Sequence, residues 1–234
     1  IDGDGLHEVA PSGDEELHWF DNDGTHMFGL PVSSGGHPDA VCVGDFRDRR
    51  EGNEVAYLDG IHHLAMADSS GNLITRKNIR SAHLQWLYPI QRGDKKGFLI
   101  SSAKKDDADA MVCDTNAKPL WRAELGYACM TVDKGFHTAQ WDGKPGMEIP
   151  LGASSNSQKV SIQVCDPDGT LLYCHQWDGY TSASVLDAKD IDSDGQDELL
   201  CGAGTTGGPE GRFSLPEGSH MHMYVIDPPP AGGN

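Results

Sequence analysis

The feature that most constrains the fold is a turn that recurs at a nearly constant interval. It has the form Asp-x-x-Gly-x or a near relative, and it begins at Asp21, Asp68, Asp114 and Asp166, at intervals of 47, 46 and 52 residues. Aspartate and glycine supply the backbone conformations that a tight hairpin needs. A repeat of about 45 to 55 residues with hairpins and no helix is typical of a β-propeller, in which each repeat is a four-stranded blade.

The segments that flank these turns are short, apolar or alternating, which predicts strands. Those before the turns are 17–20, 63–67, 110–113 and 161–165, and those after them are 26–30, 73–76, 120–123 and 171–175. With 29 glycines, 13 prolines and only 7% aromatic residues, the composition also fits many short strands joined by turns. A β-sandwich is the alternative, but it does not explain the long period.

The sequence therefore predicts an all-β fold, a single β-propeller segment over residues 1–234 with about five repeats. The repeats cover approximately 1–35, 36–80, 81–134, 135–179 and 180–230. In the second repeat we expect strands over 37–46, 54–59, 62–67 and 72–78, from the innermost to the outermost. The first repeat lacks an innermost strand and the last lacks an outermost one. We therefore expect the remaining blades of a longer chain, or a second copy, at the open edges.

The excess of acidic residues restricts the partners that the chain can bind. The chain has 36 Asp and Glu against 18 Lys and Arg, a net charge of −18, which disfavours nucleic acid and anionic membrane surfaces. No apolar run approaches the roughly 20 residues of a membrane-spanning helix. The six cysteines lack zinc-site spacing and are expected to be buried thiols, with Cys165 and Cys174 the best candidates for a disulfide bridge.

The strongest chemical motif runs from Asp190 to Glu198. It places carboxylates of Asp190, Asp192 and Asp194 at positions 1, 3 and 5, a backbone carbonyl of Gln196 at position 7 and the carboxylate of Glu198 at position 9. Such an oxygen cage suits Ca²⁺. The expected flanking strands distinguish it from an EF-hand, in which helices flank the loop.

The same pattern, truncated, opens the chain. Its expected calcium ligands are Asp2, Asp4, the backbone carbonyl of Leu6 and Glu8. Both motifs could instead be solvated acidic turns. The corresponding loops of the middle repeats, at 45–50, 92–96 and 142–146, carry Arg or Lys side chains, which can neutralise the carboxylates in place of calcium.

Loops of this kind resemble the FG-GAP repeats of integrin heads, fungal lectins and some polysaccharide lyases. The sequence of residues 36–46 and 51–55 is most similar to a blade of the rhamnogalacturonan lyases of polysaccharide lyase family eleven. Residues 141–143 resemble a later Trp-Asp-Gly segment of those enzymes, and 190–199 falls at their last calcium-loop strand pair. The resemblance implies a calcium-stabilised, extracellular or periplasmic lyase that cleaves an acidic polysaccharide by β-elimination.

Three histidines stand just before expected innermost strands, which ring the channel of a propeller. They are His37, His83 and His137, and we expect them to converge near one mouth as candidate catalytic bases. The resemblance places His37 at a channel-facing histidine of the lyases. Arg80, Lys134 and Tyr180 also precede inner strands and could bind acidic sugars. The alternative is that the histidines pack within the repeat scaffold.

Three functions remain open from the sequence. One is the lyase, a second is a non-catalytic calcium-bound module that binds glycan or protein, and a third is a structural protein whose open blade edges pair with copies of itself. Fold alone does not choose among them, because propellers host many functions. A base beside a cation in the channel would favour the first, and an intermolecular completed blade the third.

Overall fold

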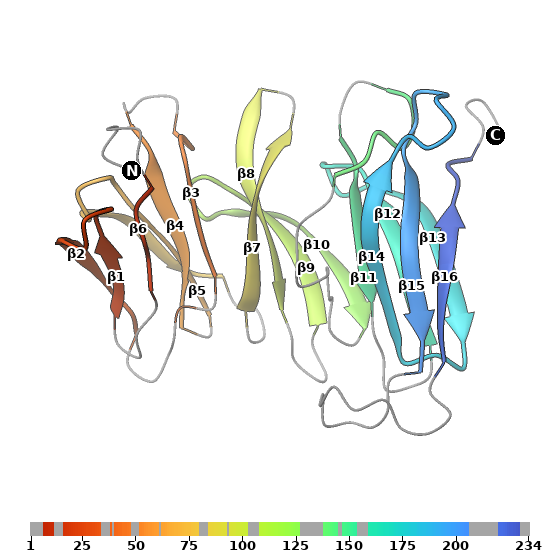
Figure 1. Cartoon of the computed structure of the whole chain (residues 1–234), viewed down its shortest axis with the longest axis horizontal. Coiled ribbons are helices and arrows are strands. Elements are labelled where there is room, and N and C mark those ends of the chain that lie inside the picture. Colours follow the sequence, from red (N-terminus) through yellow and green to blue (C-terminus); the bar gives the residue numbers. More distant parts are fainter. Residues whose placement is uncertain are drawn as a thin grey trace. The chain divides into compact units, whose positions relative to one another are not determined.

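All regular secondary structure in the described part of the chain is β. The computed structural model describes residues 7–11, 16–33, 38, 40–47, 52–60, 62–79, 84–92, 94–102, 108–126, 138–144, 147–153, 159–205 and 220–229. Within these residues sixteen strands form five sheets (Figure 1). Among the same residues, no helix has the length and apolarity needed to span a bilayer. The predicted all-β class is confirmed.

The chain divides into two compact units. The first unit contains two whole sheets and most of a third. One sheet pairs β1 (Glu16–Phe20) with β2 (His26–Pro31), and the next consists of β3 (Val41–Gly44), β4 (Glu54–Asp59), β5 (His63–Ala67) and β6 (Leu73–Asn78). The third consists of β7 (Leu84–Arg92), β8 (Lys95–Ser102), β9 (Ala108–Asp114) and β10 (Pro119–Gly126). The second unit contains the sheet β11 (Ile149–Ala153), β12 (Lys159–Cys165) and β13 (Leu171–Asp178), and the sheet β14 (Ser182–Lys189), β15 (Glu198–Gly204) and β16 (Met221–Ile226).

The predicted blade pattern is present in these sheets. In the second repeat β4, β5 and β6 match the expected strands over 54–59, 62–67 and 72–78. In the first repeat Val9 forms an isolated bridge to Phe20 beside the two-stranded sheet β1–β2, and in the fourth repeat Ala139 forms one to Glu148, next to β11. The first and last repeats are thus incomplete blades in the described residues, as expected.

Four predicted hairpin turns form with one shared geometry. In each turn the N–H of the fourth residue donates to the carbonyl of the first, as Gly71 does to Asp68 at 2.9 Å and Ala117 to Asp114 at 3.0 Å. The fourth residue has a positive φ, +81° at Gly71 and +58° at Ala117. Glycine adopts this conformation without strain, whereas alanine does so at a cost. Ala117 therefore keeps the turn of its glycine-containing equivalents.

Sheet β3–β6 is covered on both faces. Along β4 every residue is buried, and alternate side chains serve different neighbours. Val55 and Tyr57 pack in a cluster with Trp19 of β1, whereas Leu58 packs in a second cluster with Phe98 of β8. The two-residue period of a strand produces this division. A blade between two blades must therefore be apolar at consecutive positions.

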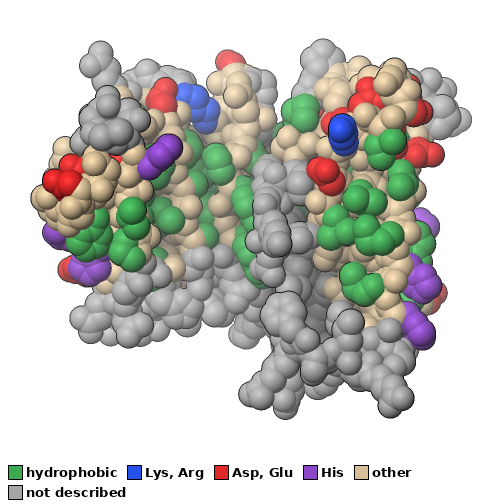
Figure 2. Space-filling view, in the orientation of Figure 1, with side chains coloured by type: hydrophobic (Ala, Val, Ile, Leu, Met, Phe, Trp, Pro, Cys, Tyr) green, Lys and Arg blue, Asp and Glu red, His purple; other side chains and the backbone are tan. Residues whose placement is uncertain are grey.

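Sheet β14–β16 is covered on one face only among the described residues. Val185 and Leu199 pack against Trp141 and Ile162. On β16 Met221, Met223 and Val225 point the other way and are 53%, 58% and 57% exposed. Figure 2 shows hydrophobic side chains on the surface of these strands. Three exposed apolar side chains therefore lie on one face of β16.

The cysteines follow the prediction of buried thiols in part, because Cys113, Cys165 and Cys201 are buried, Cys42 is half-buried and Cys174 is exposed. Within the described residues Cys42, Cys113, Cys165, Cys174 and Cys201 are free thiols. Cys165 is opposite Leu171 and Cys174 is opposite Gln163 in the register of β12 and β13. The suggested bridge between Cys165 and Cys174 is therefore wrong, because the two residues are not cross-strand partners. Burial raises the pKa of the Cys42, Cys113 and Cys201 thiols to about 12.

Candidate metal centre

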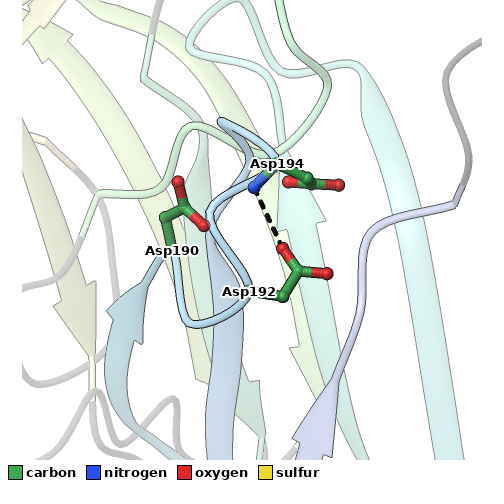
Figure 3. Close-up of side chains that lie close together, drawn as sticks. All are labelled: Asp190, Asp192 and Asp194. Atoms are coloured by element: carbon green, nitrogen blue, oxygen red, sulfur yellow. Dashed lines mark hydrogen bonds between the residues drawn. The ribbon is translucent and has the colours of Figure 1, made fainter.

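The loop between β14 and β15 gathers three carboxylates. The ligand oxygens of Asp190, Asp192 and Asp194 all lie within 4.8 Å of one another (Figure 3). Asp190 is half-buried and the other two are exposed. Oxygens bound to one calcium ion at about 2.4 Å are separated by at most about 4.8 Å. The donor type and the spacing of these three residues therefore fit a calcium ion.

Backbone amides fix these carboxylates in place. The N–H groups of Ser193 and Gly195 donate to the two oxygens of Asp190 at 2.6 and 3.1 Å. The N–H of Asp194 donates to Asp192 at 3.1 Å, the bond drawn in Figure 3. Ser193 and Gly195 have φ of +68° and +91°, which coils the loop tightly. The carboxylates are thus positioned by the fold of the loop itself.

Glu198 has a different role from the three aspartates. Its side chain is buried, and Oε2 accepts the N–H of Ile191 at 2.6 Å. It does not belong to the group whose oxygens lie within 4.8 Å. Its assignment as a ligand stays a prediction, with Oε1 as the available atom. The contact to Ile191 joins the start of the loop to the start of β15.

The same contact occurs in two other repeats. Glu148 accepts the N–H of Trp141 at 2.6 Å, and Glu54 accepts the N–H of Phe46 at 2.8 Å. We call Glu54, Glu148 and Glu198 the brace glutamates, because each joins the beginning and end of its loop. Sequence reasoning missed this role. The signal was present, since a glutamate precedes an apolar pair at the start of the second strand in each of these repeats.

Asp197 connects the loop to the preceding repeat. Its N–H donates to the carbonyl of Gln140 at 2.8 Å, and its Oδ2 accepts the N–H of Gln140 at 2.7 Å. Gln196 turns back over the loop, and its Nε2 donates to Asp194 at 3.3 Å. Asp197 therefore anchors the end of the loop to Gln140 of the preceding repeat.

Lysine side chains pair with loop aspartates at two places. Lys144 Nζ lies 2.6 Å from Asp142 Oδ2, and Lys96 Nζ lies 3.3 Å from Asp45 Oδ2. The hydrogen bond from Lys144 lowers the pKa of Asp142, and the same contact raises the pKa of Lys144. Burial raises the pKa of Glu148. The predicted pairing of a loop carboxylate with a basic side chain of the same loop is thus seen at Lys144, whereas Lys96 reaches Asp45 from β8 of the next repeat.

Most other predicted site residues lie outside the described residues. These are His37, His83, His137, Arg80, Lys134, Asp2, Asp4 and Leu6. Glu8 is half-buried beside Val9, which pairs with Phe20. Tyr180 is half-buried; its hydroxyl is 3.3 Å from that of Tyr224 and its ring stacks on His222. The structure leaves the predicted roles of these residues as predictions.

Comparison with known proteins supports the fold. No protein-family model and no curated protein matches the chain. Among solved structures it resembles the Pan2 WD40 domain of Neurospora crassa, with 14% identity, a TM-score of 0.51 and coverage of 94% of this chain and 59% of that one. The chain has a β-propeller fold.

Two further structures give the same result. The Dos1 propeller has 13% identity, a TM-score of 0.51 and coverage of 96% of this chain and 54% of that one. BBS1N, solved in complex with ARL6DN, has 7% identity, a TM-score of 0.52 and coverage of 85% and 59%. The chain thus spans between 54% and 59% of the length of these propellers. At these identities the likeness concerns the fold.

Proposed function

We propose that this chain is part of a non-catalytic, calcium-stabilised β-propeller module of the FG-GAP type, which binds glycan or protein outside the cytoplasm. The observation that carries the proposal is the cluster of three carboxylates at Asp190, Asp192 and Asp194. Calcium there would link the end of β14 to the start of β15 and offset two of the three negative charges of the cluster. Its role would be to stabilise the blade.

The residues that would hold the ion follow from the loop. The carboxylates of Asp190, Asp192 and Asp194 are preorganised by backbone amides. The carbonyl of Gln196 and the remaining oxygen of Glu198 are the expected additional ligands. All five donors are oxygen atoms, as a hard cation such as calcium prefers. Like charges this close repel one another in the absence of a cation.

Calorimetric titration with CaCl₂ after EDTA treatment and dialysis tests the proposal. Asp192→Asn should weaken binding at this loop at least 10-fold, because one anionic ligand becomes a neutral amide. Asp178→Asn, at an exposed position on β13, is the matched control and should bind as the wild type does. Equal calcium binding by both variants would exclude this loop as the site.

A uronate lyase is the second hypothesis. It is supported by the similarity of residues 36–46 to a lyase blade and by the order of the repeats. Such an enzyme needs a base for the C5 proton and a cation for the carboxylate. The ultraviolet absorbance of the unsaturated product, followed with rhamnogalacturonan and calcium, tests it. Activity that His37→Ala and EDTA both abolish would support the lyase and contradict a purely binding function.

We also propose what covers the exposed face of the sheet β14–β16. We infer that a further blade covers the outer face of β14–β16, because β3–β6 shows that a blade between two neighbours is apolar on both faces. The exposed Met221, Met223 and Val225 support this inference. The negative charge introduced by Met223→Glu should then weaken association with a separately expressed blade and leave the calcium titration unchanged. Unchanged association would contradict the inference.

A further inference from the structure

Two hydrogen bonds join the Asp190 loop, residues 190–198, to the preceding repeat. The N–H of Asp197 donates to the carbonyl of Gln140 at 2.8 Å, and Asp197 Oδ2 accepts the N–H of Gln140 at 2.7 Å. Both residues are half-buried. A bond from a backbone N–H to a carboxylate is charge-assisted and stronger than a bond between neutral groups. Asp197 therefore holds the end of the loop with its backbone and its side chain together.

Asp197 lies between the two further calcium ligands expected at the end of the loop. The carbonyl of Gln196 precedes it and the carboxylate of Glu198 follows it. Among the described residues, the cluster of three carboxylates does not include Asp197. Its Oδ2 is instead bound to the N–H of Gln140. Asp197 is therefore placed to orient neighbouring ligands and need not bind the ion itself.

The peptide group between Gln196 and Asp197 shows how this orientation works. The carbonyl of Gln196 and the N–H of Asp197 belong to one planar trans peptide, in which the two groups point in opposite directions. Because this N–H is bound to the carbonyl of Gln140, the carbonyl of Gln196 must point away from Gln140. Rotation of the peptide group would break the contact with the preceding repeat. The contact thus fixes the direction of an expected ligand.

The other two loops with a brace glutamate lack this aspartate. The residue before the glutamate is Asn53 in the second repeat and Met147 in the fourth, and Met147 is 39% exposed. In each of these loops an aspartate contacts a lysine. The Asp190 loop instead has the cluster of three carboxylates. Of the three loops, the one with the candidate calcium site is therefore the one with the anchoring aspartate.

Gln140 also belongs to the lysine-containing loop. Its Nε2 donates to the carbonyl of Lys144, so one residue contacts both loops. The side chain of Gln196 lies close by, since a Cβ at Gly143 would be 3.8 Å from Gln196 Oε1. Both loops belong to the second compact unit. A change in the order of the Asp190 loop therefore acts directly on the loop of the preceding repeat.

We propose that Asp197 is a positioning residue that couples calcium binding at the Asp190 loop to the contact between the fourth and fifth repeats. This inference rests on the proposed calcium site. The contact with Gln140 orients the Gln196 carbonyl for the ion, and because coupling is reciprocal, bound calcium strengthens that contact. Calcium would thus stabilise the junction of two blades as well as its own loop.

Calorimetric titration of Asp197→Asn and Asp197→Ala with CaCl₂ separates anchoring from charge. Both variants remove one negative charge, but asparagine keeps an oxygen that can accept the Gln140 N–H. Calcium affinity should therefore be lower in Asp197→Ala than in Asp197→Asn by about 5-fold, the equivalent of one hydrogen bond. Asp178→Ala, at an exposed position on β13, is the control and should bind as the wild type does. Equal affinities in the two Asp197 variants would overturn the proposal.

Amide hydrogen exchange of the wild type tests the coupling without a substitution. The N–H of Gln140 is bound to Asp197, whereas the N–H of Ala139 is bound to the carbonyl of Glu148 in its own repeat. Calcium, compared with EDTA, should slow exchange at Gln140 by a larger factor than at Ala139. Equal factors in a protein that binds calcium would overturn this proposal alone. A wild type that binds no calcium would overturn the proposed function together with it.

Discussion

Two loops in the second unit share a scaffold and differ in charge. The loop from Trp141 to Glu148 and the loop from Ile191 to Glu198 each have a brace glutamate that accepts an N–H seven residues earlier, at 2.6 Å in both. Asp142 and Asp192 each accept the N–H two residues later, at 2.9 and 3.1 Å. Counted from the brace glutamates, Lys144 therefore corresponds to Asp194.

The two loops differ in the charged groups that lie beside their carboxylates. In the first loop the ammonium group of Lys144 is 2.6 Å from Asp142. In the second loop an aspartate takes the lysine's position, and three carboxylates meet without a basic side chain among them. The two loops share the contacts of the brace glutamate and of Asp142 or Asp192. They differ at two positions, because Gln140 and Lys144 stand where the second loop has Asp190 and Asp194.

The largest expected effect is the creation of a calcium site in the lysine-containing loop. Gln140→Asp combined with Lys144→Asp reproduces the positions of Asp190 and Asp194. We expect the double variant to bind one more calcium ion per chain than the wild type, which at 100 times Kd stabilises the fold by about 2.7 kcal/mol. Calorimetric stoichiometry measures this. Lys144→Asp alone is the control, and an unchanged stoichiometry in the double variant would break the correspondence between the loops.

The next effect concerns the brace glutamates. Glu148→Leu and Glu198→Leu should each destabilise the fold by about 1–3 kcal/mol, because the N–H of Trp141 or of Ile191 loses its acceptor. Both variants should show this destabilisation in EDTA as well, because the brace contact does not require bound calcium. Urea unfolding measures it, with Glu148→Gln, which keeps an acceptor oxygen, as the control. If Glu198→Leu is neutral in EDTA but harmful in calcium, Glu198 is a ligand and does not act as a brace.

A smaller effect comes from two matched backbone positions. Ser193 and Gly143 have φ of +68° and +70° and occupy equivalent places in the two loops. Ser193→Gly should stabilise the protein and Gly143→Ser should destabilise it, each by about 1 kcal/mol, because a Cβ is unfavourable in left-handed backbone. A Cβ at Gly143 would meet nothing closer than Gln196 at 3.8 Å, so no clash confuses the measurement. Thermal unfolding in EDTA should show opposite signs, and equal signs would contradict the equivalence.

The smallest effect is a pH dependence of the lysine-containing loop. The Lys144 hydrogen bond lowers the pKa of Asp142 below its ordinary value. A carboxyl whose pKa is lower in the folded state stabilises the protein above its unfolded pKa, near about 4, and this contribution is lost as the pH falls through the folded pKa. Lys144→Met should therefore be less stable than the wild type at pH 6. The difference should shrink in acid, and a difference independent of pH would argue against the ion pair.

The strands and turns could be predicted from local sequence. The Asp68 turn and its flanking strands depend on residues within a few positions, and even Ala117 kept the glycine-like turn of its repeat. The role of Glu198 was not predictable in the same way, because a carboxylate at that position satisfies both a ligand pattern and a backbone contact. The contact of Asp197 with Gln140 joins two repeats. No local pattern in the sequence specifies that contact.

The most direct test of the central claim is thermal unfolding of the wild type and Asp194→Lys, each in excess calcium and in EDTA. The variant gives the Asp190 loop the lysine of its counterpart, so an internal cation replaces the external one. We predict that EDTA lowers the Tm of the wild type by several degrees, and that most of this response is lost in the variant, whose Tm in EDTA is no lower than that of the wild type. A wild-type Tm indifferent to EDTA, or an equal response in Asp194→Lys, would contradict the claim that this loop holds a stabilising calcium ion.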